Sequence, residues 1–129
     1  MANQKNKIVA VLSDLMFTVK IQEAAKTAGV DVVFVKSGEQ AMEQAKQHPA
    51  AIILDLNDAA GNALDIITRL KTDEQTSKIS LLGYVSHVQA DLKQAAQERG
   101  CDVVMARSAF SHNLPSILRR YAQAHRVAS

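Results

Sequence analysis

The sequence is poor in cysteine and aromatic residues, and its positive and negative charges nearly balance. One cysteine among 129 residues excludes an intramolecular disulfide, and no cluster of cysteine and histidine has the spacing of a zinc site. Aromatic residues make up 4% of the chain and are scattered, and the formal net charge is +2. The sequence therefore offers neither the stacking platform nor the dense basic stripe of nucleic-acid-binding proteins, and we expect no nucleic-acid partner.

Long apolar runs and glycine-rich motifs are also missing. The polar residues 1–7 are followed by only five consecutive apolar residues, too few for a signal-peptide core or a membrane span. The chain contains no G-x-G-x-x-G motif and no P-loop. We therefore expect a cytoplasmic protein with no membrane partner. Its length fits one domain that needs no disulfide or metal ion to fold.

Short apolar runs alternate with segments of helical periodicity along the whole chain. Strands are predicted at residues 8–12, 30–35, 51–54, 79–85 and 103–105. Between and after them, helical patterns predict helices that end at Gly29, near Pro49, at Lys71 and at Gly100, and a last helix around residues 114–121. Ser37 and Gln40 have the spacing of a capping box. Strict alternation of this kind predicts an α/β fold, a doubly wound parallel five-stranded sheet with helices on both faces.

Polar residues follow the predicted strands, and Asp55 is the most informative of them. It comes directly after the apolar run Ile52-Ile53-Leu54, which suits a strand buried on both faces. The carboxyl ends of parallel strands meet at one edge, where open α/β folds bind their ligands. The polar residues that this edge collects are Ser13, Asp14, Asp55, Asn57, Asp58, Ser86, His87, Arg107 and Ser108. Carboxylates, hydroxyls and a cation at one edge indicate an anion or phosphoryl site.

These features together resemble the CheY-like receiver domain of bacterial response regulators. The resemblance rests on the fivefold strand–helix rhythm, Ile53-Leu54-Asp55, a hydroxyl residue after the fourth strand, and Gly100 leading to a cation after the fifth. It covers residues 7–123 and implies a flavodoxin-like (βα)5 fold with strand order 2-1-3-4-5. We expect residues 7–123 to form the receiver-like domain and residues 1–6 and 125–129 to be flexible termini.

The resemblance also implies a role for each matching residue. Asp55 matches the phosphoacceptor of a two-component phosphorelay, and Ser86 and Arg107 match the residues that contact the phosphoryl group. Spacing back from Gly100 would favour Val85 over Ser86 at the hydroxyl position. A Mg²⁺ ion, if bound, would take ligands from Asp14, Asp55 and the backbone carbonyl of Asn57. The implied partners are a sensor histidine kinase or another signalling protein, and a second copy of the chain through the face formed by the fourth helix, the fifth strand and the last helix.

The sequence departs from the receiver pattern at several of these positions, so the chain resembles an atypical or degenerate receiver. The paired acids fall on Leu12 and Ser13, with Asp14 one place later, and the lysine is replaced by Arg107. The switch aromatic is replaced by Val104. Losing an acid weakens a Mg²⁺ site, whereas an arginine fork pairs well with carboxylates. We therefore predict that Arg107 pairs with Asp55, Asp14 or both, as a built-in cation where receivers hold Mg²⁺.

Three interpretations of function stay open. The first is a signalling module, not an enzyme, that is phosphorylated on Asp55 and acts through protein–protein contacts. The second is a pseudo-receiver with the same fold that is never phosphorylated and binds its partners constitutively. The third is a flavodoxin-like cofactor-binding protein or small enzyme. Asp14 is equally suited to cap the first helix, and Cys101 suits a small buried core residue.

Overall fold

Five parallel strands form the centre of the protein, in the order β2-β1-β3-β4-β5. The computed structural model describes residues 7–58, 62–86 and 89–127. The strands are β1 (Lys7–Val11), β2 (Asp31–Val35), β3 (Ala51–Asp55), β4 (Ser80–Val85) and β5 (Val103–Ala106). Each predicted strand is present, and its ends differ from the prediction by at most one residue. The predicted fold class, parallel pairing and strand order are confirmed.

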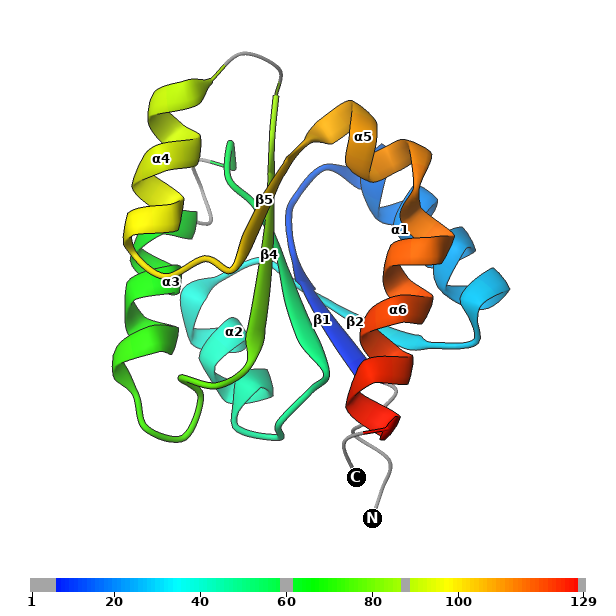
Figure 1. Cartoon of the computed structure of the whole chain (residues 1–129), viewed down its shortest axis with the longest axis horizontal. Helices are drawn as coiled ribbons and strands as arrows, with labels where there is room; N and C mark the ends of the chain where they lie inside the picture. The colour runs from blue at the N-terminus through cyan, green and yellow to red at the C-terminus, as the bar shows by residue number, and fades with distance from the viewer. Residues whose placement is uncertain (1–6, 59–61, 87–88, 128–129) are drawn as a thin grey trace.

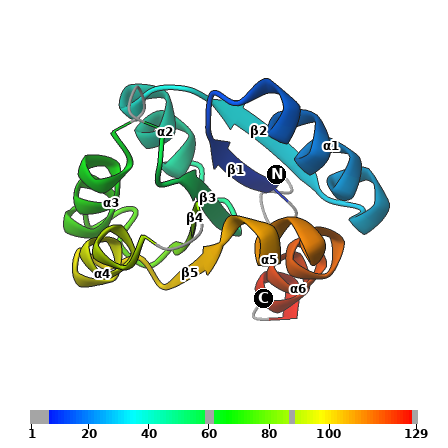
Figure 2. The ribbon, with the colours of Figure 1, turned by 90° about the horizontal axis from the view of Figure 1, so that it is seen from above.

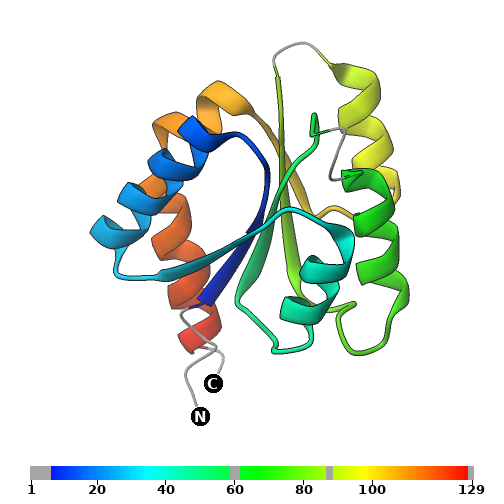
Figure 3. The same ribbon diagram turned by 180° about the vertical axis from the view of Figure 1, so that it is seen from behind.

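Helices cover the sheet on both faces, as Figures 1, 2 and 3 show. On one face lie α1 (Leu15–Ala28), α5 (Arg107–His112) and α6 (Leu114–Val127). On the other lie α2 (Gly38–Ala45), α3 (Ala63–Thr72) and α4 (Ala90–Glu98). Strand β3 is buried on both sides, because Ile53 packs into the α1–α6 core while Ile52 and Leu54 pack into the core beneath α2 and α3. The apolar run before Asp55 thus has the double burial that its sequence predicts.

The helix ends follow the local sequence signals. Gly29 closes α1 with a left-handed φ of 75°, a conformation that glycine adopts without steric cost. The Ser37 side chain accepts the Gln40 backbone N–H at 3.2 Å, while the Gln40 side chain accepts the Lys36 N–H instead of the Ser37 N–H of a standard capping box. Helix α2 ends at Ala45, a little before the predicted stop near Pro49.

The segment after β5 differs from the sequence prediction. Arg107 and Ser108 were expected in a loop, but Arg107 begins the short helix α5. This helix forms because Phe110 is fully buried against Tyr84 and Phe17, and that burial fixes the turn before α6. Helix α6 then continues to Val127, beyond the predicted domain end at residue 123. Residues 125–127 of the predicted flexible terminus 125–129 belong to α6, while residues 1–6 and 128–129 lie outside the described part of the chain. The predicted flexibility of the termini stays a prediction.

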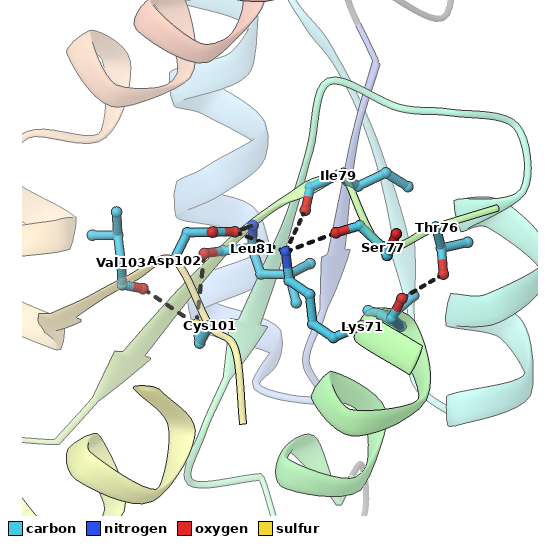
Figure 4. A network of polar contacts seen from close by, with 9 residues as sticks. Lys71, Thr76, Ser77, Ile79, Leu81, Cys101, Asp102 and Val103 are labelled. Atoms are coloured by element: carbon cyan, nitrogen blue, oxygen red, sulfur yellow. Dashed lines mark hydrogen bonds and ion pairs between the residues drawn. The ribbon is translucent and has the colours of Figure 1, made fainter. Parts of the chain in front are cut away.

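A polar network fixes the amino-terminal edge of the sheet, opposite the site (Figure 4). The Lys71 ammonium donates to the backbone carbonyls of Ser77 and Ile79, at 3.1 and 3.2 Å, and to Asp102 Oδ2 at 3.2 Å. The same Asp102 oxygen accepts the Leu81 N–H at 2.8 Å. The network therefore joins the end of α3 to the starts of β4 and β5.

Among the described residues, no helix has the length and apolar character needed to cross a lipid bilayer. The cytoplasmic location stays a prediction from the sequence.

Candidate functional site

The carboxyl edge of the sheet lies at the top of Figure 1. Polar side chains from four strand–helix connections meet at this edge. Asp55 is half-buried at the end of β3, directly beside Tyr84 in the pairing of β3 with β4. Its Oδ1 accepts the Asn57 backbone N–H at 3.0 Å. Burial raises the pKa of Asp55 above its ordinary value, and nearby Asp58 and Asp14 add to this, while the Asn57 hydrogen bond and Arg107 oppose it. Burial is therefore the main influence on the charge state of Asp55.

Asp14 and Arg107 form a direct ion pair across the site. Arg107 Nη2 donates to Asp14 Oδ2 at 2.7 Å, and its guanidinium carbon lies 4.6 Å from the centroid of the Phe17 ring. Asp14 Oδ1 accepts the Phe17 backbone N–H at 3.1 Å and so caps α1. The Phe17 N–H, followed by Arg107, lowers the pKa of Asp14. Arg107 pairs with Asp14, one of the two partners predicted for it, and Asp14 also caps α1. The role of Asp14 as a Mg²⁺ ligand stays a prediction.

No ion pair joins Arg107 to Asp55 among the described contacts. The two residues are nevertheless close enough for the guanidinium to lower the pKa of Asp55. Arg107 reaches toward α1, which lies on the opposite face of the sheet from α4. Its side chain therefore points to the α1 side of the sheet, away from α4.

Two loops are tied to each other by Asn57. Its side-chain oxygen accepts the Ser86 N–H at 2.7 Å, and its side-chain amide donates to Gln89 Oε1. Ser13, at the position of a receiver's second acid, donates its hydroxyl to Asp58 Oδ2 at 2.8 Å. Asn57 thus holds the loop after β3 against the loop after β4, a role that the sequence alone did not indicate.

The carboxylates expected as Mg²⁺ ligands already accept hydrogen bonds from the protein. Both Asp14 oxygens are engaged, one by the Phe17 N–H and the other by Arg107. Asp55 Oδ1 is also engaged, by the Asn57 N–H. Within the described residues, no three histidine, cysteine, aspartate or glutamate side chains are grouped as metal ligands. A cation bound through Asp14 Oδ2 would compete with Arg107 for that oxygen.

The two candidates for the hydroxyl position face opposite sides of the sheet. Val85 is buried in the core on the α2–α4 face, whereas Ser86 lines a cavity together with Asp14 and Arg107. The side chain of Ser86 therefore lies on the side of the sheet that carries the ion pair. His87 lies outside the described residues, His112 is exposed on α5, and burial raises the pKa of Cys101 to about 11, as suits a core residue.

An aromatic cluster beneath the site was not foreseen from the sequence. Tyr84 packs against two phenylalanine rings. Its ring centroid lies 4.8 Å from that of Phe17 and 5.0 Å from that of Phe110. Burial raises the pKa of Tyr84, with Asp55 next in effect, and its hydroxyl has no hydrogen-bond partner among the described residues. Aromatic residues scattered along the sequence can reveal such a cluster only once α1, β4 and α5 are placed together.

Three apolar side chains of α1 point outward beside the site. Leu15, Met16 and Val19 are 76%, 83% and 48% exposed. The apolar positions predicted for this helix, including Phe17 and Ile21, are buried on its other side. The sequence could have indicated this patch, because Leu15, Met16 and Val19 are apolar but do not share the helical spacing of the buried residues of α1.

Comparison with solved structures identifies the fold. The phosphorylated cyanobacterial phytochrome response regulator RcpA matches with a TM-score of 0.77 and 22% identity, covering 96% of each chain. This chain has the receiver fold. The receiver domain of the sensor histidine kinase PA1611 from Pseudomonas aeruginosa PAO1, which holds a magnesium ion in its active-site cleft, matches with a TM-score of 0.78 and 17% identity over 92% of this chain and 98% of that one.

A third receiver fold is the chemotaxis response regulator CheY4 of Vibrio cholerae, with a TM-score of 0.76 and 18% identity over 89% of this chain and 97% of that one. No protein-family model and no curated protein sequence matches the chain. At these identities the likeness to receiver structures is one of fold. The function of the site therefore depends on the residues that this chain places there.

Proposed function

We propose that the protein is a receiver-like signalling module of a two-component phosphorelay, with Asp55 as phosphoacceptor, and that it is not an enzyme. The observation that carries the proposal is the position of Asp55, half-buried at the carboxyl end of a central strand. Ser86 and Arg107 stand at the same edge, a hydroxyl donor and a cation of the kind that a phosphoryl group requires. The receiver fold of the whole chain supports the same function.

In this proposal a carboxylate oxygen of Asp55 forms a bond to the phosphorus of the phosphodonor, while the bond from phosphorus to the donor's leaving group breaks. The leaving group, which is the histidine nitrogen of a kinase or the acetate oxygen of acetyl phosphate, departs with that electron pair. Negative charge then accumulates on the phosphoryl oxygens and must be offset by nearby cations and hydrogen-bond donors. Arg107 carries five N–H donors, of which one is used on Asp14. The guanidinium already lowers the pKa of Asp55, so it is close enough to act on charge that develops there.

Intact-protein mass spectrometry after incubation with acetyl phosphate tests the proposal. We expect the gain of one phosphoryl group in the wild-type chain and none in Asp55→Asn. Asp58→Asn is the matched control, because it removes a carboxylate from the same loop and leaves the acceptor in place. Absence of the added mass with and without Mg²⁺, or its persistence in Asp55→Asn, would overturn the assignment of Asp55.

The Asp14–Arg107 pair favours a second candidate, a pseudo-receiver that binds partners constitutively. A guanidinium nitrogen 2.7 Å from Asp14 supplies a permanent cation within the site itself, whereas the PA1611 receiver domain holds a magnesium ion in its active-site cleft. Titration with Mg²⁺, followed by the amide NMR signals of residues 13–17 and 55–58, separates the two candidates. Saturable shifts there support a receiver with an inducible site, and unchanged signals up to high Mg²⁺ support the pseudo-receiver.

Both candidates act through another protein, a sensor histidine kinase or another signalling protein. The exposed Leu15, Met16 and Val19 support such contacts, because apolar side chains gathered on a surface commonly mark an interaction site. A homodimer through α4, β5 and the last helix is a separate proposal, supported by the exposed Val103 on the edge strand β5. Sedimentation of the wild-type chain and of Val103→Glu tests it, and identical monomeric behaviour would reject it.

A further inference from the structure

A cavity of about 490 Å³ opens between α1 and α5, beside the Asp14–Arg107 pair. Its volume lies in the range of sites that bind small molecules and is larger than a phosphoryl group needs. Lys20, Arg107, Ser86, Ser108 and Ser111 supply its polar walls. Neither Lys20 nor Ser111 has a part in the chemistry proposed for Asp55. The part of the cavity that these two residues line is therefore available to a different ligand.

The charges around the cavity favour an anion. Two cations, Lys20 and Arg107, line it together with one carboxylate, Asp14. Arg107 neutralises Asp14 through the 2.7 Å pair and keeps further N–H donors. Lys20 Nζ donates to Ser111 Oγ at 3.1 Å, and no described carboxylate forms an ion pair with it. The cavity therefore keeps one positive charge that no described carboxylate offsets.

The remaining wall of the cavity is apolar. Phe17 and Met16 line it, and Phe17 is held rigidly because its ring packs on Tyr84 and Phe110 below. Met16 is 83% exposed, and its flexible thioether adapts to the shape of a ligand. Phe17 is only 4% exposed and the Arg107 guanidinium lies over its ring, so Met16 supplies most of the accessible apolar surface. Accessible apolar surface beside convergent cations and hydroxyls is typical of a pocket for an amphiphilic small molecule.

We propose that this cavity binds a small organic anion, a carboxylate or a phosphate monoester attached to a flat apolar group. The charged end contacts Lys20 and the free donors of Arg107, with the serine hydroxyls completing its hydrogen bonds. The apolar group lies against the exposed Met16 side chain. Binding needs no phosphoryl group on Asp55, so the protein has a ligand input that is independent of phosphorylation.

NMR titration of the full-length Asp55→Asn variant tests this site separately from the proposed phosphorylation. Phenyl phosphate and benzoate are the anionic probes, and benzyl alcohol is the neutral one. We expect one or both anions to give saturable amide shifts in residues 14–20 and 107–111, with a Kd of about 1 mM or tighter. The tighter of the two anions identifies the charged group that the site prefers. Benzyl alcohol should bind at least about tenfold more weakly.

Two lysines of the same helix provide the matched variants. Lys20→Met removes the cation of the cavity and should weaken the anion about tenfold. Lys26→Met removes an exposed lysine in the last turn of α1, away from the cavity, and should leave the Kd unchanged. The proposal is overturned if neither anion gives saturable shifts at these residues, if benzyl alcohol binds equally well, or if the two variants change the Kd alike.

Discussion

Replacing Asp14 separates its two contributions to stability, the helix cap and the ion pair. Asp14→Asn keeps a side-chain oxygen that can accept the Phe17 N–H, since asparagine caps helices as well as aspartate does. It removes the negative charge that Arg107 pairs with at 2.7 Å. Asp14→Ala removes both the cap and the charge. The difference between the two variants therefore isolates the cap.

The expected energies follow from the exposure of the pair. The Asp14 and Arg107 side chains are 34% and 41% exposed, so solvent screens their attraction, and Asp14→Asn should cost about 0.5 kcal/mol. Loss of the cap adds about 1 kcal/mol, so Asp14→Ala should cost about 1.5 kcal/mol. With a typical dependence on urea, these costs lower the unfolding midpoint by about 0.3 M and about 0.8 M.

The pH dependence gives the sign of the charge effect. Because the folded state lowers the pKa of Asp14, the pair stabilises fully above the unfolded pKa of about 3.9 and is lost as the pH falls through the folded value. The cost of Asp14→Asn in unfolding free energy should therefore be complete at pH 6 to 7 and vanish in strong acid.

Asp55 provides a control in which the charged carboxylate has the opposite effect on stability. Its folded pKa is raised, so Asp55→Asn should increase stability at pH 7, and the gain should disappear below the unfolded pKa.

Urea unfolding monitored by circular dichroism, over a pH series, measures these differences. A double-mutant cycle of Asp14→Asn with Arg107→Met adds the pairwise energy, because methionine keeps part of the contact with Phe17. A coupling near zero at pH 7 would show that the ion pair does not form in solution and would return Asp14 to the candidate metal ligands. Equal costs for Asp14→Asn and Asp14→Ala would refute the separate helix cap.

Three further substitutions test the packing that holds the site in place. Lys71→Met removes the ammonium that donates to two backbone carbonyls and to Asp102. It should cost about 1 to 3 kcal/mol in urea unfolding, and a cost no larger than that of the exposed control Lys78→Met would contradict the network. Tyr84→Phe removes a buried hydroxyl with no described partner, so stability should be unchanged or rise by up to about 1 kcal/mol; a clear loss would mean that the hydroxyl is hydrogen-bonded. In Gly83→Ala the new Cβ would lie 2.9 Å from Leu56 Cδ1, which should cost about 1 to 3 kcal/mol. A stability equal to wild type would show that Leu56 moves aside freely.

The secondary structure could be predicted from sequence because its signals are local. Alternating apolar runs and helical stripes located the five strands, and Gly29 and Ser37 marked helix boundaries that the structure contains. Helix α5 was missed because a six-residue helix has too few turns to display a period. Its formation depends on Phe110 packing against Tyr84 and Phe17, contacts that join segments far apart in the chain.

Part of the candidate site could also be predicted from the sequence, because the order of strands and helices locates the strand ends. Parallel strands send their carboxyl ends to one edge, so the sequence was enough to gather Asp14, Asp55, Ser86 and Arg107 there. It left open whether Arg107 pairs with Asp14 or Asp55, and whether Ser86 or Val85 faces the site. Those choices depend on strand register and on side-chain direction, which local patterns do not contain.

The sequence by itself determined the alternation of strands and helices and the position of Asp55 at the end of a doubly buried strand, because burial periodicity encodes both. The strand order was implied by the resemblance to receiver domains. Only the tertiary structure decided that Arg107 reaches Asp14, that Asn57 bridges two loops, and that Lys20 joins Arg107 around a cavity. Each of these contacts joins residues from different strand–helix units. Their distances follow from how the helices pack on the sheet, and no single segment specifies that packing.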